Sequence, residues 1–173
     1  MAQQPAPVLL DLGPVVGSNI TFFGDRLSCK IYVEDLIGDV ESHARRGDRA
    51  SLARFLGARL TQPDDSVDGV LCWDLFDFLD RSSGQVLAGR LVRLLRRGGA
   101  LHGFFGASAA ELTNYSRFAV EAEDRLRKRP YPATPVRRHV LHPRDMSKMF
   151  EGLVVAASVL LKTNAREALF RKA

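Results

Sequence analysis

The sequence predicts an α/β fold built around a mostly parallel sheet. Short apolar runs alternate with amphipathic stretches along the chain, which is the pattern of strand–helix–strand units. No internal repeat, low-complexity tract or Gly/Ser linker interrupts this alternation. The 173 residues, 46% hydrophobic and 26% charged, have ordinary globular composition and suit a single domain over 1–173.

The elements follow from the local pattern. The first strand is a short apolar run that Gly13-Pro14 ends, and the second ends in Glu34-Asp35. Strands are predicted at 8–12, 29–33, weakly at 57–62, within 64–74, and at 100–105, 153–161 and 166–171. Helices are predicted at 15–27, at 36–56 (one helix, or two broken near Gly47), at 82–97 and at 144–152.

Residues 82–97 are the clearest helix in the chain. Leu87, Leu91, Leu94 and Leu95 form an apolar stripe at helical spacing, and Gly98-Gly99 is expected to cap its C-terminus. The last two strands are expected to form an antiparallel hairpin that turns at Asn164 with a positive φ.

Residues 107–143 are the least regular part and are expected to form a loop or flap with a short strand. They contain four of the eight prolines and much of the basic charge. Residues 1–110 carry 12 Lys and Arg against 13 Asp and Glu, whereas 111–173 carry 13 against 7, a balance of +6. This asymmetry indicates an anionic partner at 125–138, such as RNA, an acidic protein or a phosphorylated small molecule, or otherwise a solvated basic surface.

Composition also argues against several classes of protein. Cys29 and Cys72 are the only cysteines, and neither has partners at metal-ligand spacing, so neither a disulfide scaffold nor a zinc site is expected. No apolar run approaches the ~20 residues that span a bilayer. The N-terminal residues 1–7 lack the pattern of a signal peptide, and a cytoplasmic location is therefore expected.

Four segments in order are similar to the class I S-adenosylmethionine-dependent methyltransferases. They are the glycine-containing loop at 9–17 (LLDLGPVVG), the acidic strand end at 33–35 (VED), the strand at 66–74 (SVDGVLCWD), and the passage at 91–101 (LVRLLRRGGAL). The resemblance covers about 8–172. It implies a methyltransferase-type, Rossmann-like three-layer sandwich with a C-terminal antiparallel hairpin.

The resemblance implies that S-adenosylmethionine is the cofactor and that the protein transfers its methyl group. Close approach of a ligand to the backbone needs glycine, and an acid after the second strand accepts hydrogen bonds from ribose. Asp35 is slightly favoured over Glu34 for that role. The residues expected at the cofactor are Asp11, Gly13, Pro14, Gly17, Glu34, Asp35, Cys72 and Trp73.

Two departures from the family pattern support an alternative. Val15 stands where the family usually has a glycine, and Leu56-Gly57-Ala58-Arg59 supplies no acid near the adenine. The alternative is a catalytically degenerate member of the fold that acts as a binding or scaffold partner. A third hypothesis is RNA binding through 125–138, whose basic residues would contact phosphates.

The methyl acceptor, a small molecule or a macromolecule, is not evident from the sequence, although 107–143 occupies the place of a substrate-side insertion. His102 is expected to be a core histidine of its strand. No catalytic base is assigned among the candidates, which are His102, His139, His142, Tyr115, Asp74 and Asp77. The apolar strand 153–161 is expected to lie at the edge of a homodimer.

Overall fold

A six-stranded mixed sheet forms the centre of the molecule. The structure is a computed structural model and describes residues 6–173. The first five residues lie outside the described part, and with them most of the segment 1–7, for which no signal peptide was predicted. The strand order is β2-β1-β3-β4-β8-β7, with parallel pairing from β2 to β4 and antiparallel pairing from β4 to β7. The strands are β1 (Val8–Asp11), β2 (Lys30–Val33), β3 (Val67–Trp73), β4 (Leu95–Gly106), β7 (Leu153–Leu160) and β8 (Ala165–Lys172). The predicted α/β class is confirmed.

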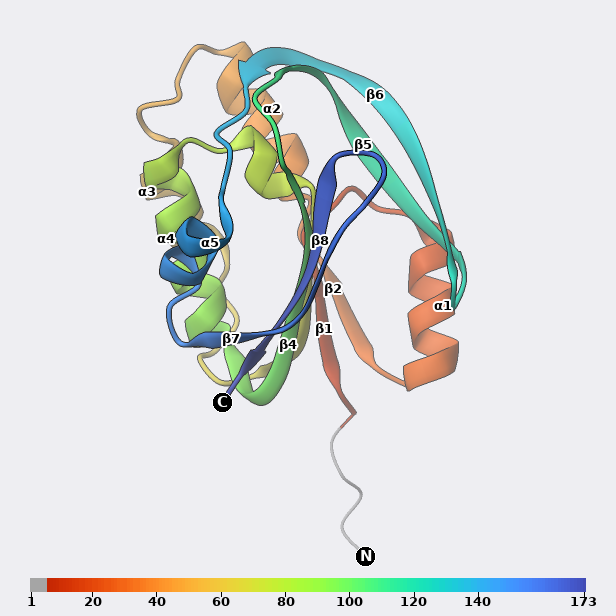
Figure 1. Cartoon of the computed structure of the whole chain (residues 1–173). Helices are drawn as coiled ribbons and strands as arrows, with labels where there is room; N and C mark the ends of the chain where they lie inside the picture. Colours follow the sequence, from red (N-terminus) through yellow and green to blue (C-terminus); the bar gives the residue numbers. More distant parts are fainter. Residues whose placement is uncertain (1–5) are drawn as a thin grey trace, which may run out of the picture.

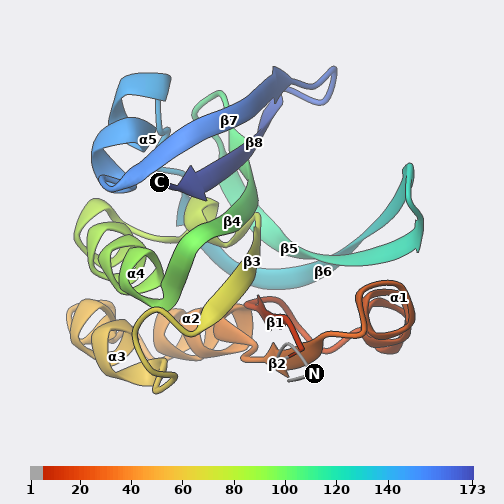
Figure 2. The ribbon, with the colours of Figure 1, turned by 90° about the horizontal axis from the view of Figure 1, so that it is seen from below.

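Helices cover the two faces of this sheet unequally (Figures 1 and 2). Helices α2 to α5 lie on one face, whereas α1 stands on the other face together with a long two-stranded hairpin. The helices are α1 (Gly17–Leu27), α2 (Leu36–Arg45), α3 (Leu52–Arg59), α4 (Arg81–Leu94) and α5 (Pro143–Met149), with a 3-10 turn, η1 (Leu75–Phe78). The break near Gly47 therefore separates two helices.

The main core lies between the sheet and α2 to α5. Leu87, Leu91 and Leu94 of the predicted stripe are fully buried. Asp80 begins α4 by accepting a hydrogen bond from the Ser83 N–H at 2.9 Å, which satisfies one of the free donors of the first turn. The stripe packs α4 against the core between α3, α5 and β4.

The predicted C-terminus of this helix was wrong. Helix α4 ends at Leu94, because the backbone of Leu95 is already extended, and Gly98 has a φ of +78° inside β4. The pairing of β3 with β4 shifts register between the pairs Val67–Leu95 and Gly69–Ala100, so the Arg96–Gly99 segment is an irregularity in the strand. The weak strand at 57–62 is also absent, since α3 continues to Arg59.

Residues 107–143 were predicted as a loop with a short strand, but the structure has a long antiparallel hairpin there. It consists of β5 (Glu111–Ala122) and β6 (Arg125–Arg137), and we call this pair the hairpin. Pro130, Pro132 and Pro135 lie in β6. A strand with only one partner leaves half of its backbone positions without a ladder bond, so it tolerates proline. The C-terminal hairpin β7–β8 is confirmed, with Asn164 at a φ of 58°.

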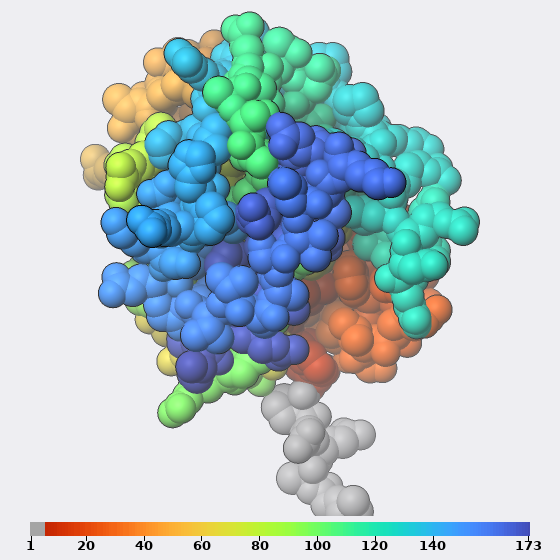
Figure 3. Space-filling model, viewed as in Figure 1, coloured from red at the N-terminus to blue at the C-terminus, as the bar shows by residue number. Residues whose placement is uncertain are grey.

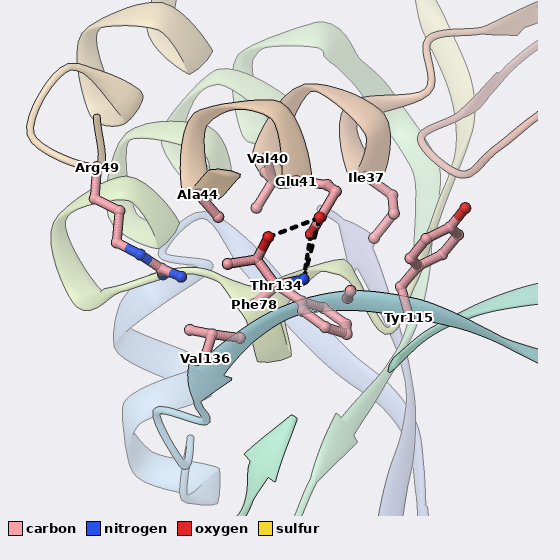
Figure 4. A pocket seen from close by; sticks show the side chains of 10 residues that line it. Ile37, Val40, Glu41, Ala44, Arg49, Phe78, Tyr115, Thr134 and Val136 are labelled. Atoms are coloured by element: carbon pink, nitrogen blue, oxygen red, sulfur yellow. Dashed lines mark hydrogen bonds between the residues drawn. The ribbon is translucent and has the colours of Figure 1, made fainter. Parts of the chain in front are cut away.

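The hairpin spans the carboxyl ends of the parallel strands (Figure 1). At one end, Thr134 donates its backbone N–H and its hydroxyl to the Glu41 carboxylate of α2, at 2.9 and 2.8 Å (Figure 4). At the other end, the Asn19 side chain of α1 donates to the Phe118 carbonyl at 2.8 Å and accepts from the Val120 N–H at 2.7 Å. The hairpin is thus fastened to helices on both sides of the sheet.

Candidate functional site

The predicted cofactor residues converge at one edge of the sheet. The Glu34 N–H donates to the Asp11 carbonyl at 2.8 Å, and the Leu36 N–H donates to the Leu12 carbonyl at 3.0 Å. The loop after β1 and the end of β2 are therefore adjacent. Because β3 pairs with β1 in parallel, its end at Cys72 and Trp73 lies at the same edge.

Asp11 is buried, and its carboxylate organises the loop. Oδ1 accepts hydrogen bonds from the Gly13 N–H at 2.9 Å and from the Trp73 indole N–H at 2.6 Å. Burial raises the pKa of Asp11, and these two hydrogen bonds oppose that shift. The family resemblance implies that Asp11 orients the loop or reaches the methionine ammonium group indirectly; in the structure its carboxylate holds the Gly13 backbone.

Trp73 occupies the space directly over Gly13. A Cβ atom at Gly13 would stand 2.6 Å from Trp73 Cδ1, so only glycine fits beneath the indole. Trp73 is 5% exposed and has a left-handed backbone, with a φ of 50°. Its indole stacks on Phe118 of the hairpin, with ring centroids 5.2 Å apart and an angle of 6° between the planes. Phe118 also stacks on Phe104 of β4 at 5.3 Å.

The two acids after β2 have different surroundings. Glu34 Oε2 pairs with the Arg59 Nη1 atom at 2.6 Å, and Oε1 accepts from the Gln62 side-chain amide at 2.6 Å. Asp35 has a φ of 30° and accepts the Gly38 N–H through Oδ1 at 3.0 Å, which makes it the N-cap of α2. Glu34 is thus bound by Arg59 of α3 and by Gln62, which follows α3, whereas Asp35 caps the first turn of α2.

Asp35 and Pro14 together line a pocket of about 260 Å³ beneath the hairpin. Tyr115 and Arg117 of β5 form its other wall. Gly17 begins α1, with no atom within 4 Å of a Cβ built on it. The Val15 side chain is 60% exposed and lines a different space between α1 and the hairpin, so it does not fill the pocket.

A hollow of about 860 Å³ opens on the α1 face of the sheet (Figure 3). The sheet contributes Leu71, His102, Phe104 and Glu167, α1 contributes Phe22 and Phe23, and the hairpin contributes the alternate residues Leu112, Asn114, Ser116, Phe118, Val120 and Ala122. Their period of two follows from the strand geometry of β5. Trp73, Asp74 and Asp77 line the same hollow, so Trp73 stands between it and Gly13.

His102 was predicted to be a core histidine, and this prediction was wrong. Its side chain faces the hollow, with Nε2 2.9 Å from Glu167 Oε1. Because Phe104 pairs with Glu167 in the register of β4 and β8, His102 and Glu167 are diagonal neighbours on one face of the sheet. Among the other candidates for a base, His139 and His142 are exposed and outside the hollow.

Two aspartates follow β3 and line the hollow. Asp77 is 8% exposed, accepts the Gly106 N–H at 2.9 Å and pairs with Arg138 Nε at 2.9 Å. Asp74 is also 8% exposed, and its Oδ1 has no hydrogen-bond partner within residues 6–173. Burial raises the pKa of Asp74 to about 6, although Lys128 opposes the shift. Cys72 is fully buried beside Asp11, which raises the pKa of its thiol.

Sequence reasoning considered Phe118 as a substrate contact of the segment 107–143 or part of an interaction surface, but it did not predict its stack on Trp73, and it missed Lys128 and Glu167 as site residues. Their contributions depend on the fold of the hairpin and on the register of β8, neither of which has a local sequence signal. It also missed Arg59, although it noted that the segment 56–59 lacks an acid; the Arg59 guanidinium binds the Glu34 and Asp39 carboxylates instead.

The basic segment 125–138 coincides with β6. Part of its charge is neutralised within the chain, because Arg127 pairs with Glu121 and Arg138 pairs with Asp77. Within residues 6–173, no group of three or more His, Cys, Asp or Glu side chains is arranged to hold a metal ion. The same part of the chain has no helix whose length and apolar character would let it cross a membrane.

Comparison with solved structures identifies the fold. At the level of sequence, no protein-family model and no curated protein matches the chain. Among solved structures, the PH0226 protein of Pyrococcus horikoshii OT3 aligns with a TM-score of 0.59 at 13% identity, over 98% of this chain and 83% of that chain. The Burkholderia thailandensis 1,6-didemethyltoxoflavin-N1-methyltransferase, with bound 1,6-didemethyltoxoflavin and S-adenosylhomocysteine, aligns with a TM-score of 0.55 at 16% identity, over 96% and 72%.

The glycopeptide N-methyltransferase MtfA, in complex with S-adenosylmethionine, aligns with a TM-score of 0.51 at 12% identity, over 99% of this chain and 89% of that chain. The chain therefore has the fold of the class I methyltransferases, as its sequence motifs suggested. Identities this low establish the architecture, and function has to be argued from the site.

Proposed function

We propose that the protein is an S-adenosylmethionine-dependent methyltransferase whose cofactor cleft is closed in this conformation. The observation that supports it is that the loop after β1 has a space on either side. On one side, Pro14 of this loop and Asp35 line the small pocket, whereas Trp73, which covers Gly13, lines the hollow. On the other side, the 860 Å³ hollow has the size expected of a ligand site.

The residues at this edge fit the adenosyl end of the cofactor better than its methionine end. Asp35 keeps one carboxylate oxygen outside its capping hydrogen bond, and it faces the small pocket beside Pro14. Gly13 does not offer its backbone to a ligand, because Trp73 covers it and Phe118 stacks on the Trp73 indole. Binding of the whole cofactor therefore requires these two rings to move away from the loop.

The chain's own residues would prepare an acceptor in the hollow. Bound S-adenosylmethionine supplies an activated methyl group, so the protein mainly has to align the acceptor and exclude water. Phe22, Phe23 and Phe104 provide apolar walls for this purpose. His102 is the best-placed base, since a carboxylate that accepts from one ring nitrogen leaves a lone pair on the other.

A second candidate function is that of a binding or scaffold protein without catalysis. Two contacts favour it: Trp73 over Gly13, and the Arg59–Glu34 ion pair where an acid near the adenine was expected. Under this proposal, the closed cleft is the permanent state of the protein.

Calorimetric titration of the isolated chain with S-adenosylmethionine and S-adenosylhomocysteine separates the two candidates. The methyltransferase proposal predicts saturable binding of both ligands, weakened by the need to displace Trp73. The wild type and a Trp73→Ala variant are both titrated at millimolar ligand. If neither gives heat with either ligand, the methyltransferase proposal is refuted and the binding or scaffold function remains.

The proposed partners follow from two surfaces. Arg117 of β5 and Arg129 of β6 line a space of about 680 Å³ beside the start of α1, where Arg127 is paired with Glu121; the two remaining guanidinium groups suit an anionic partner. Strand β7 is exposed along nearly its whole length, and residues 153–161 contain no charged residue to oppose edge pairing. We propose antiparallel pairing of β7 with β7 of a second copy.

A further inference from the structure

Asp74 is a side chain of the hollow whose burial is hard to explain by folding alone. It is 92% buried, and its Oδ1 meets no hydrogen-bond donor within residues 6–173. A buried carboxylate oxygen without a donor costs free energy, so native proteins normally pair it. The neighbouring acid Asp77, with equal burial, has both a backbone N–H and a guanidinium as partners. Within the described part of the chain, Asp74 has only the Ser116 side chain and a backbone group to stabilise its charge by hydrogen bonds, and its Oδ1 lacks a donor at the wall of the hollow.

Several of the other charged groups of the hollow already form ion pairs. Glu167 pairs with His102, and Glu123 at the hairpin tip pairs with Arg26. Lys128 attracts Asp74, yet it makes no ion pair with it within 4 Å, and its ammonium lies 5.6 Å from the centre of the Phe118 ring. The charged or titratable groups that line the hollow with Asp74 are Asp77 of η1, His102 of β4, Glu123, Asp124 and Arg125 at the hairpin tip, Lys128 of β6, Arg138 after β6 and Glu167 of β8.

The walls around this carboxylate are aromatic. Phe22 and Phe23 approach from α1, Phe104 from the sheet and Phe118 from the hairpin. We propose that the hollow binds an organic amine, with its ammonium against Asp74 and its aromatic or apolar body against these phenylalanines. An ammonium donates the missing hydrogen bonds, and the rings stabilise it further through their π faces.

This site exists without the cofactor. The inference rests on the proposed function only in that the amine, once its ammonium has given a proton to His102, would then be the methyl acceptor. Binding of the amine alone is tested in the absence of S-adenosylmethionine, so the two proposals fail separately.

The test uses two probes with the same aromatic body, 2-phenylethylamine and 2-phenylethanol. Trp73 is the only tryptophan of the chain and lines the hollow, so its fluorescence reports binding. At pH 8 we expect the wild type to bind the amine about ten- to a hundredfold more tightly than the alcohol, which is the range of a charge-assisted hydrogen bond. If the wild type binds the amine and the alcohol with equal affinity, the proposal is overturned without recourse to a variant.

Three variants sharpen the result. Asp74→Asn keeps the shape of the side chain and should abolish the preference for the amine. Asp25→Asn removes the same charge from an exposed position of α1 outside the hollow and should keep the preference. Lys128→Met removes the competing cation and should tighten amine binding several-fold. An unchanged preference in Asp74→Asn, or its loss in Asp25→Asn, would contradict the assignment of Asp74.

Discussion

Replacing Trp73 with alanine is expected to open the space above Gly13 and to strengthen the binding of S-adenosylhomocysteine. The indole is held closed by two contacts, its hydrogen bond to Asp11 at 2.6 Å and its stack on Phe118 at 5.2 Å. A ligand that needs the Gly13 backbone has to break both before it binds, so its apparent affinity is reduced by the scarcity of the open form.

The size of the effect follows from these contacts. The stack contributes about 0.5–1.5 kcal/mol and a hydrogen bond to a charged group about 1.5–3 kcal/mol. Removing this barrier to opening should therefore tighten binding by about 2–4 kcal/mol, on the order of 30- to 1000-fold. The same change empties a buried site, so the free energy of unfolding should fall by about 3–5 kcal/mol.

Calorimetry with S-adenosylhomocysteine measures the affinity, and urea denaturation measures the stability of each variant. Phe104→Ala is the matched control, because it removes a ring from the same stack and hollow but not from Gly13. If a folded Trp73→Ala variant binds the ligand no better than the wild type or the Phe104→Ala variant, then Trp73 does not close the cleft.

Three further predictions concern stability and assembly. Burial raises the pKa of Asp74 from 3.8 to about 6, so the folded state binds its proton more tightly than the unfolded state and stability falls as pH rises through this window. Urea denaturation of Asp74→Asn should accordingly show a gain of up to about 3 kcal/mol at pH 8 that disappears near pH 4; a gain independent of pH would contradict the raised pKa. Arg59→Gln should lower the free energy of unfolding by about 1–2 kcal/mol, because it leaves the largely buried Glu34 carboxylate with fewer donors, and an unchanged denaturation midpoint would show that the ion pair contributes nothing. Val159→Lys places a charge on the exposed edge strand and should convert a wild-type dimer into a monomer in sedimentation experiments, whereas a wild type that is monomeric at high concentration would rule out the edge dimer.

The order and type of most sheet elements were predictable because each depends on a local pattern. The apolar run of β1 and its stop at Gly13-Pro14 need no tertiary information, since a strand buried on both faces has to be apolar. The turn at Asn164 follows from the ease with which asparagine adopts a positive φ. The last turn of α4 was predicted wrongly because Leu95 continues the helical stripe, yet its buried side chain belongs to β4.

The hairpin shows what local patterns do not contain. Its prolines and arginines are typical of a loop, and only the pairing of β6 with β5 makes them part of a strand. The stack of Trp73 on Phe118 joins residues 45 positions apart in the chain, and the pairing of His102 with Glu167 depends on the register of β4 against β8.

The sequence by itself determined which residues meet at the carboxyl edge of the sheet, because parallel strands bring their ends to the same side. Only the tertiary structure decided that Trp73 covers Gly13 with Phe118 stacked on it, that Arg59 binds Glu34, and that Asp74 lines an open hollow. These are contacts between distant side chains, and their geometry is fixed by packing rather than by any pattern along the chain.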